Sequence, residues 1–406
     1  MNEELEKFLN NNPELRFVDV LLPDICNIVR GKRIPRDDLA KVYGDGLQVP
    51  SSIYLLDVNG RGTDAGGRGF SDGDPDVKVR PVPGSLNLVP WGPLGAGQVL
   101  GSLYELDDSV CPVDPRHVLG SVVERLHESG LHPVVALELE FYLIDAASAD
   151  EGRPRPPILP DTGRRASATQ VYSLADLDGF TRFLSEVETT CQAQGVPLGA
   201  TTAEYAVGQY EINLQHVDDP LCAADHAILL RRAVQGLARG HDAVATFMAK
   251  PYPEDAGNGL HVHVSLMDDK GRNVFDNGSS EGSIQLRQAV AGMLDLLPQS
   301  MAIFAPNVNS YRRFAPNLYV PTGPTWGYNN RAVAARIPAG DNAARRIEHR
   351  MAGADANPYL TLAAVLAGLH HGINEGLVPP DPRSDNAGTQ LDRAVPFTWQ
   401  GALDQL

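Results

Sequence analysis

Hydrophobic and polar residues alternate in the stretch ALELEFY. In a strand, Leu137, Leu139 and Phe141 would share one face, and Glu138 and Glu140 would share the other. Two carboxylates within an apolar run need a compensating charge, which a divalent cation bound by hard oxygen ligands would supply. The alternative is the solvated outer face of a half-buried strand. The surrounding run VVALELEFYLI is rich in β-branched and aromatic residues, so we expect one long strand.

The stretch HVHVSL repeats this alternation. His261 and His263 would share one face of a strand, and the two valines would take the other. Histidine is the commonest metal ligand, but polar strand residues can equally be held by hydrogen bonds alone. The preceding residues DAGNGL include Gly257 and Gly259, which let the backbone approach a ligand closely.

A third alternating stretch, RRIEHR, places Arg346, Glu348 and Arg350 on one face. A carboxylate between two guanidiniums belongs either to a surface ion-pair ladder or to a metal and phosphate site. Seven arginines lie between residues 312 and 350, namely Arg312, Arg313, Arg331, Arg336, Arg345, Arg346 and Arg350. In a chain of net charge −17 they form a local cationic region suited to phosphate and carboxylate recognition.

Two further glutamates, Glu204 and Glu211, lie seven residues apart around Gly208 in TTAEYAVGQYEINL. A regular strand would direct them to opposite faces. They can reach one site only if a bulge or a turn at the glycine resets the register. The spacing does not decide between these arrangements.

The periodicity of the remaining segments predicts an α+β fold with antiparallel strands and helices outside them. Helices are expected at residues 3–9, 115–129, 174–194, 225–245 and 357–377, and at 283–304 with an interruption at Pro298. Strands are expected at residues 15–22, 52–58, 77–82, 85–91, 259–266, 331–338 and 345–352. Residues 59–76 are rich in Gly and Asp and predict a loop. We place the domain boundary between residues 1–107 and 108–406.

Composition and charge narrow the classes of partner. The net charge of −17 opposes binding to nucleic acid or to an anionic membrane surface. The acidic N-terminal residues do not have the pattern of a signal peptide, and no apolar run is long enough for a membrane span. The four cysteines are far apart and form no C-x-x-C pair, so we expect reduced thiols in a cytoplasmic protein.

Taken together, the candidate ligands favour one shared site. Five glutamates would bring a charge of −5 and two divalent cations +4, with His261 as a neutral sixth ligand. The glutamates are Glu138, Glu140, Glu204, Glu211 and Glu348. With the arginines nearby to hold a triphosphate, this set fits a metal-assisted phosphoryl transfer.

The order of these motifs resembles the glutamine synthetase superfamily along nearly the whole chain. The motifs are E-x-E, E-x(6)-E containing GQ, G-x-H-x-H, NSY-x-R, NR-x(4)-R-x-P, RRIE-x-R and ANPYL. The resemblance implies an N-terminal β-grasp domain, a C-terminal catalytic domain with a curved antiparallel sheet, and a homo-oligomer of stacked rings, a dodecamer with active sites between subunits. It also implies a helical segment beyond Leu406, so the chain is either short or incomplete.

The resemblance implies a role for each matching residue. One Mg2+ or Mn2+ would be held by Glu140, Glu204 and Glu211, and a second by Glu138, His261 and Glu348. Glutamate would be bound by Gly257, Arg313, Arg331 and Arg350, and ATP by His263, Ser265, Arg331, Arg336 and Arg346. Arg331, Glu348 and Arg350 would serve catalysis. The implied reaction transfers the γ-phosphoryl of ATP to the glutamate side chain, and a nitrogen nucleophile attacks the resulting acyl phosphate.

The departures from the family pattern concern the nucleophile. Tyr319 stands where glutamine synthetases carry the flap glutamate that binds ammonium, and the aspartate-bearing FDGSS segment is absent, with Asp57 as its possible substitute. Tyr319, Trp326 and Tyr328 would make an aromatic pocket for an alkyl amine, unless these rings only pack the loop. The sequence most resembles γ-glutamylpolyamine synthetases. The alternatives are an ammonium-using glutamine synthetase, a ligase for ethanolamine or another monoamine, and a non-catalytic nucleotide-binding sensor.

Overall fold

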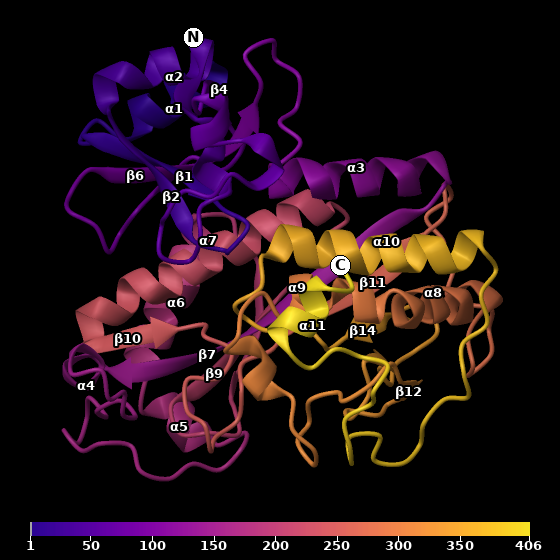
Figure 1. The fold of residues 1–406 in the computed structure, drawn as a ribbon. Coiled ribbons are helices and arrows are strands. Elements are labelled where there is room, and N and C mark those ends of the chain that lie inside the picture. Colours follow the sequence, from indigo (N-terminus) through magenta and orange to yellow (C-terminus); the bar gives the residue numbers. More distant parts are fainter. Residues whose placement is uncertain (1) are drawn as a thin grey trace.

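Two sheets organise the chain, and each has its own buried core (Figure 1). The computed structural model describes residues 2–406. The first sheet has the strand order β2-β1-β6-β4-β3, with β5 paired to β6. Its elements are α1 (Glu3–Asn11), β1 (Phe17–Pro23), β2 (Val29–Pro35), α2 (Leu39–Asp45), β3 (Leu47–Pro50), β4 (Asp76–Pro81), β5 (Asn87–Leu88) and β6 (Ala96–Tyr104).

The second sheet has eight strands in the order β12-β13-β14-β11-β7-β9-β8, with β10 paired to β7. Its strands are β7 (His132–Asp145), β8 (Leu198–Ala203), β9 (Gln209–Leu214), β10 (Ala243–Thr246), β11 (Leu260–Met267), β12 (Trp326–Tyr328), β13 (Ala335–Ile337) and β14 (Ile347–His349). The accompanying helices are α3 (Pro115–Glu128), α4 (Ala146–Asp150), α5 (Leu174–Asp178), α6 (Thr181–Ala193), α7 (Pro220–Ala238), α8 (Ile284–Asp295), α9 (Leu297–Phe304), α10 (Pro358–Asn374) and α11 (Trp399–Leu403). Within this second sheet, every pairing is antiparallel except that of β12 with β13. The expected α+β class is confirmed.

Helices cover one face of the second sheet and leave the polar face for the site. Leu137, Leu139 and Phe141 of β7 lie in the same buried cluster as α7, α8 and α10. In Figure 1, α7 and α10 lie between the indigo N-terminal unit and the lower part of the large sheet. The alternation read from ALELEFY is therefore real, because its apolar side chains are the ones that pack against helices.

Asp114 joins the two units at the start of α3. Its side chain accepts a hydrogen bond from the backbone N–H of Arg116 at 2.7 Å, which caps the helix, and another from that of Leu103 at 2.6 Å. The expected cap and first helical turn are confirmed. The expected domain boundary at residues 107 and 108 falls between β6 and α3 and stays a prediction. Within residues 2–406, no helix has the length and apolar character needed to cross a membrane.

The prediction of a strand at residues 52–58 was wrong. Ser51–Tyr54 forms a 3-10 helix followed by a turn. The cause is Asp74, whose carboxylate accepts hydrogen bonds from the Ser52 N–H at 3.0 Å and the Ser52 hydroxyl at 2.9 Å, so that these donors do not face a neighbouring strand. Of residues 85–91, only β5 is extended, because the chain turns back at Pro90 to pair with β6.

Two predicted helices have different bounds in the structure. Residues 174–194 form α5 and α6 with a break at Gly179. The helix expected at 225–245 starts earlier, at Pro220 under an Asp219 cap, and ends at Ala238, since Asp242 adopts a φ of +52° and the chain continues as β10. The predicted interruption near Pro298 is confirmed, because α8 ends at Asp295 and α9 begins at Leu297.

Candidate functional site

Strand register places the candidate ligands in one row across the second sheet. Glu211 of β9 lies opposite Glu140 of β7, and Glu138 of β7 lies opposite His261 of β11. The row continues where His263 of β11 lies opposite Glu348 of β14, which in turn lies opposite Arg336 of β13. Because directly opposed residues share a face, side chains far apart in the sequence converge on the polar face of the sheet.

Glu204 reaches this face through a tight turn rather than a bulge. It follows β8, and its N–H donates to the carbonyl of Gln209 at 2.9 Å, where β9 begins. Gly208 has a φ of +77°, and a side chain there would meet the Leu143 carbonyl at 2.9 Å. The hairpin thus requires glycine at this position. Of the two arrangements that the spacing of the glutamates allowed, a bulge or a turn, the structure has the turn.

Two groups of side chains have ligand atoms close enough to hold one cation each. The first is Glu138, His261 and Glu348, and the second is Glu140, Glu211 and His261. Within each group, one ligand atom from every residue lies within 4.8 Å of the others. Glu204 is not in either group. It lies at the start of the turn in the hairpin that carries Glu211, and its pKa responds to the charge of Glu140. Carboxylate oxygens with one imidazole suit a hard divalent cation, so the residues present fit the cations expected from the sequence.

Crowding of carboxylates raises the pKa values of the two glutamates on the hairpin. Burial, then the charges of Glu138, Glu140 and Glu204, raises the pKa of Glu211 to about 10. Burial, then the charge of Glu140, raises the pKa of Glu204 to about 7. The surrounding protein does not balance the negative charge of these ionised carboxylates, so without a cation Glu211 keeps its proton at neutral pH. A divalent cation would take the place of that proton, which is the electrostatic setting that favours cation binding.

Histidines and arginines have the opposite effect on Glu138 and Glu348. Although burial raises the pKa of Glu138, hydrogen bonds from His261 at 3.0 Å and His263 at 2.8 Å outweigh it and hold the pKa well below its ordinary value. Burial also raises the pKa of Glu348, but the charge of Arg350 lowers it to about 2. Arg350 and Arg336 both donate to Glu348, the latter at 2.8 Å. Both carboxylates are therefore ionised at neutral pH.

Arg313 is buried, and no carboxylate of the described residues forms an ion pair with it. It is 2% exposed, and one terminal N–H donates to the Met351 carbonyl at 3.1 Å. Among the residues that the structure describes, Arg313 has no carboxylate within ion-pair distance, and its Nε has no hydrogen-bond partner. Gly257 lies directly against it, because a side chain there would meet Arg313 Cγ at 2.6 Å. The two residues matched to glutamate binding are therefore neighbours.

The residues matched to ATP flank the row on the β11 and β14 side. Arg346 donates through Nε to His263 Nδ1 at 3.2 Å, and the Ser265 hydroxyl donates to the Arg345 carbonyl at 2.9 Å. Arg336 lies on β13, and Arg331 is exposed. The charge of Arg331 lowers the pKa of Glu204 against the larger effect of burial.

The aromatic residues expected around an amine do not share one position. Tyr319 is 69% exposed, and its backbone carbonyl accepts a hydrogen bond from Arg350 at 3.4 Å. Trp326 is buried, with its indole N–H donating to the Pro380 carbonyl at 2.6 Å, and Tyr328 packs on it and donates to Glu281. Trp326 and Tyr328 therefore pack the loop, as the alternative interpretation of these aromatic residues expected. Of the three aromatic residues, only Tyr319 is largely exposed.

Asp57, the expected substitute for the missing aspartate, lies in the N-terminal unit. Its carboxylate accepts hydrogen bonds from the N–H groups of Asn59 and Arg61, each at 2.8 Å. This carboxylate closes its own turn, and its bonds to those backbone groups lower its pKa. The structure does not bring it into contact with the carboxylate row of the same chain.

Three polar residues of the site were not predicted from the sequence. Asn213 donates to Glu138 at 3.1 Å, and the His216 ring centroid lies 6.0 Å from that of His263. Burial, then the charges of His263 and Arg346, lowers the pKa of His216 to about 4. Gln209, in the GQ of the glutamate motif, is 2% exposed. Asn213 lies two residues after Glu211 in β9, so both side chains are on the same face of the strand. This spacing is the sequence signal from which Asn213 could have been predicted.

Comparison with known proteins agrees with this geometry. Residues 112–406 match the family described as glutamine synthetase, catalytic domain. Over 403 residues, the chain is 43% identical to γ-glutamylputrescine synthetase PuuA of Escherichia coli (strain K12), covering 99% of this chain and 85% of that protein. It is 35% identical over 372 residues to glutamate–isopropylamine ligase of a Pseudomonas species, covering 90% of this chain and 79% of that protein.

A solved structure shares the whole fold. The GmaS/ADP complex superposes with a TM-score of 0.82 at 25% sequence identity, covering all of this chain and 90% of the other. The sequence match spans the ordered motifs, and the structural match spans both sheets. The chain therefore belongs to the glutamine synthetase family.

Proposed function

We propose that this protein is an ATP-dependent carbon–nitrogen ligase that joins the side-chain carboxylate of L-glutamate to an amine. The observation that carries the proposal is the 43% identity to γ-glutamylputrescine synthetase over 99% of the chain. The geometry supports it, because the row of carboxylates and histidines lies beside arginines suited to phosphate and carboxylate groups.

The proposed reaction has two steps. A side-chain carboxylate oxygen of glutamate attacks the γ-phosphorus of ATP, the bond from that phosphorus to the bridging oxygen breaks, and ADP leaves. The amine nitrogen then attacks the γ-carbonyl carbon of the acyl phosphate. The bond between that carbon and the phosphate oxygen breaks, the nitrogen loses a proton, and inorganic phosphate leaves with one oxygen that began in glutamate.

Mg2+ or Mn2+, two or more per site, is the proposed cofactor. Glu138, His261 and Glu348 would hold one cation, and Glu140 and Glu211, with Glu204 beside them, would hold another. Bound there, the cations would neutralise phosphate oxygens and lower the barrier to phosphoryl transfer.

The chain's own cations provide the remaining charge. Arg313 is buried without a carboxylate partner among the described residues, so it can bind a carboxylate of glutamate. Arg350 and Arg336 donate to Glu348, and Arg331 is exposed, so these three arginines are proposed to hold phosphate oxygens in position. His263, Ser265 and Arg346 are proposed to lie along the nucleotide.

A polyamine such as putrescine or spermidine is the proposed acceptor. Tyr319 supports an alkyl amine over ammonium, because it offers an exposed ring and no carboxylate. An ammonium group at the far end of the amine can lie against such a ring. With Trp326 and Tyr328 committed to packing, Tyr319 is the residue we assign to the amine, and Asp57 remains a candidate only across a subunit boundary.

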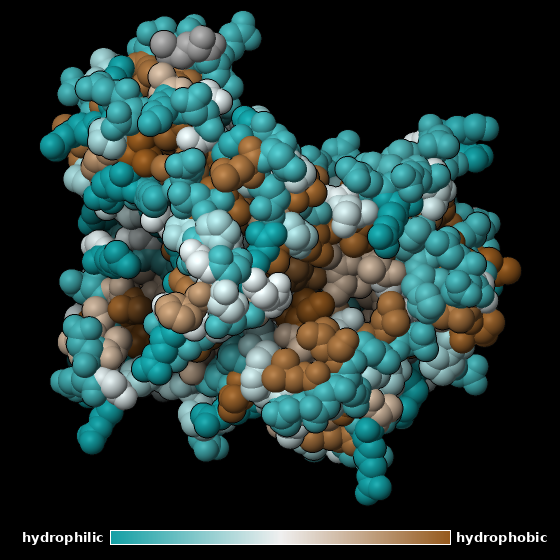
Figure 2. Space-filling model, turned by 45° about the horizontal axis from the view of Figure 1, so that its top comes forward, coloured by the Kyte–Doolittle hydropathy of each residue, from teal (hydrophilic) through white to brown (hydrophobic). Residues whose placement is uncertain are grey.

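Assembly into stacked rings with sites between subunits is part of the proposal. Several large hydrophobic side chains are exposed in the single chain, among them Phe70 at 95%, Val378 at 87% and Leu94 at 81%. Figure 2 shows hydrophobic residues gathered in a hollow near the middle of one face, within a mostly hydrophilic surface. Such exposed apolar surface supports a further subunit contact. A cytoplasmic location is proposed with it, and the four free cysteines agree with a reducing compartment.

The direct test supplies ATP, Mg2+ or Mn2+, and glutamate, and compares ammonium, putrescine, cadaverine, spermidine, spermine and ethanolamine as acceptors. Phosphate release is measured, and products are identified by mass spectrometry. A γ-glutamyl polyamine is expected. Glutamine as the sole product would replace the proposal by ordinary glutamine synthesis, and a γ-glutamyl ethanolamide by a monoamine ligase. ATP binding without any product would favour a non-catalytic sensor, although all six matched metal ligands are present.

A further inference from the structure

Gln209 connects two parts of the candidate site. It begins β9, directly after the turn that follows Glu204, and its side chain is almost completely buried. Its Nε2 donates to the Gly257 carbonyl at 3.0 Å and to Asn258 Oδ1 at 3.1 Å, while its Oε1 accepts from the Ala206 N–H at 3.3 Å. The nitrogen of the amide therefore bonds to the loop that contains Gly257 and Asn258, and its oxygen bonds to the turn that contains Ala206.

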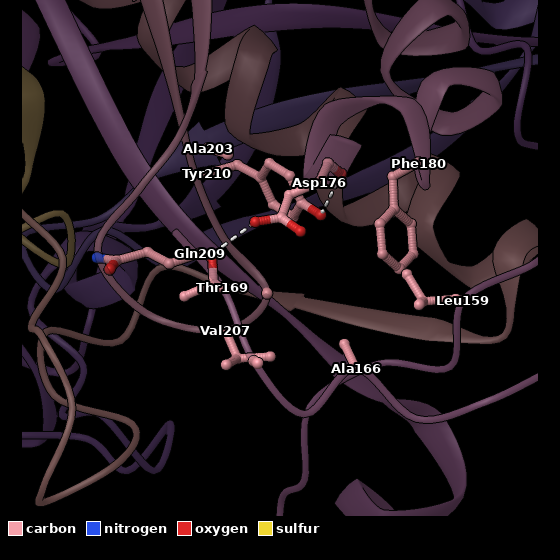
Figure 3. Close-up of a pocket in the computed structure, with 11 residues that line it drawn as sticks. Leu159, Ala166, Thr169, Asp176, Phe180, Ala203, Val207, Gln209 and Tyr210 are labelled. Atoms are coloured by element: carbon pink, nitrogen blue, oxygen red, sulfur yellow. Dashed lines mark hydrogen bonds between the residues drawn. The ribbon is translucent and has the colours of Figure 1, made fainter. Parts of the chain in front are cut away.

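Gln209 borders the small pocket behind the hairpin, but its amide points away from the pocket. Figure 3 shows Gln209 pointing away from Phe180 and Leu159, which line the other end of that pocket. The polar contacts inside the pocket are instead the hydrogen bonds to Asp176 from Thr169 at 2.6 Å and from the Tyr210 hydroxyl at 3.3 Å. Gln209 thus faces the loop of residues 255–259, which we call the glycine loop, and not the interior behind the hairpin.

The glycine loop leaves no space for movement toward Arg313. A side chain at Gly257 would meet Arg313 Cγ at 2.6 Å and the Ala249 carbonyl at 2.7 Å. Asn258 is fully buried, and its Nδ2 donates to the Met248 carbonyl at 2.9 Å. The glycine loop therefore lies between Gln209 and Arg313, the buried arginine proposed to bind a carboxylate of glutamate.

A second contact sets the distance from the loop to the carboxylate row. The Gly259 N–H donates to Glu140 Oε2 at 2.6 Å, and the Glu140 N–H donates back to the Gly259 carbonyl at 3.1 Å. That contact fixes one end of the loop, whereas the Gln209 amide fixes the Gly257 end. Without the amide, the Gly257 carbonyl and the Asn258 side chain would both lose a buried hydrogen bond.

We propose that Gln209 is a positioning residue for the amino acid substrate: its amide holds the glycine loop so that Gly257 and Arg313 present glutamate to the carboxylate row. The proposal rests on the proposed function for the identity of the amino acid. It assigns to Gln209 no contact with cation, nucleotide or substrate. Its effect passes through the loop alone, and this separates it from a metal ligand.

The test measures glutamate binding directly by calorimetry, with Mg2+ and a non-hydrolysable ATP analogue present. Gln209→Met keeps the length of the side chain and removes all its hydrogen bonds, while Gln209→Glu keeps the acceptor and removes both donors. We expect glutamate to bind about tenfold more weakly to each variant, because two buried acceptors lose their donor. In Gln209→Met, which adds no ionisable group, Mn2+ affinity without glutamate should change by less than about threefold, since the ligand atoms keep their positions.

Gln194→Met is the matched control. Gln194 is also a buried glutamine, and its Nε2 donates to the Leu88 carbonyl at 2.8 Å, in a contact between the two units. It should leave glutamate affinity at the wild-type value. Hydrogen exchange in residues 255–259 should be faster in the Gln209 variants and unchanged in this control.

Two results would overturn the proposal. One is wild-type glutamate affinity in a folded Gln209 variant, and the other is a loss of Mn2+ affinity as large as the loss of glutamate affinity. If neither variant folds, the wild-type protein decides: glutamate with Mn2+ must slow exchange in residues 204–209 and 255–259 together, and protection of one segment alone contradicts the coupling. If the wild-type protein binds glutamate, the Gln209 variants weaken that binding, and no γ-glutamyl amide forms, the proposed function is refuted and this inference stands.

Discussion

At the scale of single residues, the arginines of the site differ in whether a carboxylate of the protein pairs with them. Arg350 and Arg336 are paired with Glu348, which is 1% exposed. Arg313 is equally buried but has no such partner among residues 2–406, and burial lowers its pKa. A buried guanidinium without a counterion is costly, so this position is arranged for an anion that the protein itself does not supply.

Removing one member of the first ligand group should stop turnover without unfolding the protein. In Glu138→Ala or His261→Ala, one cation loses a ligand, and the ligase rate should fall by about a thousandfold or more, since charge neutralisation carries much of phosphoryl transfer. Circular dichroism should report wild-type secondary structure. His127→Ala, on the exposed side of α3, is the control with a wild-type rate. A wild-type rate in either ligand variant would remove the two-cation account.

Tyr319 should set the preference between amines and ammonium. Tyr319→Glu introduces a carboxylate into a position that is 69% exposed, and it should lower the ratio of putrescine to ammonium turnover by about tenfold, because an anion favours the small cation. The neighbouring Leu318→Glu, which adds the same charge at a 36% exposed position, should leave the ratio unchanged. An unchanged ratio in Tyr319→Glu would show that this ring is not part of the amine site.

At the scale of elements, the hairpin of β8 and β9 makes stability depend on pH. The folded-state pKa values of Glu204 and Glu211 are raised to about 7 and about 10, above the ordinary carboxylate value. Protonation of these groups therefore stabilises the fold fully below the unfolded pKa near 4.5, and this contribution is lost as the pH rises toward 10.

With divalent cations removed by EDTA, the melting temperature should accordingly fall between pH 6 and pH 9. Glu211→Gln should flatten the fall, and Mg2+ should raise the melting temperature of the wild-type protein more at pH 9 than at pH 6. Glu281→Gln, at an exposed glutamate, should follow the wild-type curve. If Glu211→Gln also followed it, the hairpin carboxylates would not be the source of the pH dependence.

The contact between α8 and α10 depends on glycine. A side chain at Gly292 would meet the Gly368 carbonyl at 2.2 Å and the Gly372 nitrogen at 2.4 Å. Gly292→Ala should therefore lower the free energy of unfolding by about 1–3 kcal/mol, as overpacked cores do. Gly44→Ala, at a helical glycine of α2 with open space around it, is the control and should not destabilise the protein. Chemical denaturation measures both, and equal values would contradict close packing here.

Elements whose period was strong could be predicted, and those held by distant contacts could not. β7, β11 and α10 follow their alternation or helical period. Residues 52–58 look like a strand but are turned by Asp74, which is twenty-two positions away from Ser52 in the sequence. β6 was missed because its glycines weaken the strand pattern, although it is central to the first sheet.

The same division holds for the candidate site. Alternation correctly placed Glu138 with Glu140, and His261 with His263, on one face. It could not give the register that sets Glu138 opposite His261, because register depends on which strands pair. Alternation also could not show that the indole N–H of Trp326 donates a hydrogen bond to the Pro380 carbonyl, because these two segments are far apart in the chain.

At the scale of the whole molecule, the second sheet brings opposite charges together in a chain that is strongly acidic overall. Glu211, Glu140 and Glu138 occupy one side of the row, and Glu348 with its arginines occupies the other. Helices pack against the far face of this sheet and share its buried core. A fixed array of charges suits a reaction in which positioning and charge neutralisation supply most of the rate.

The central claim is that ATP activates the glutamate side chain before the amine attacks, and an isotope experiment tests it most directly. Glutamate carrying oxygen-18 in both side-chain carboxylate oxygens is incubated with ATP, Mg2+ and putrescine, and the phosphate and the amide are weighed by mass spectrometry. The account predicts one oxygen-18 in the released phosphate and one in the γ-glutamyl product. Amide formation with unlabelled phosphate would contradict it.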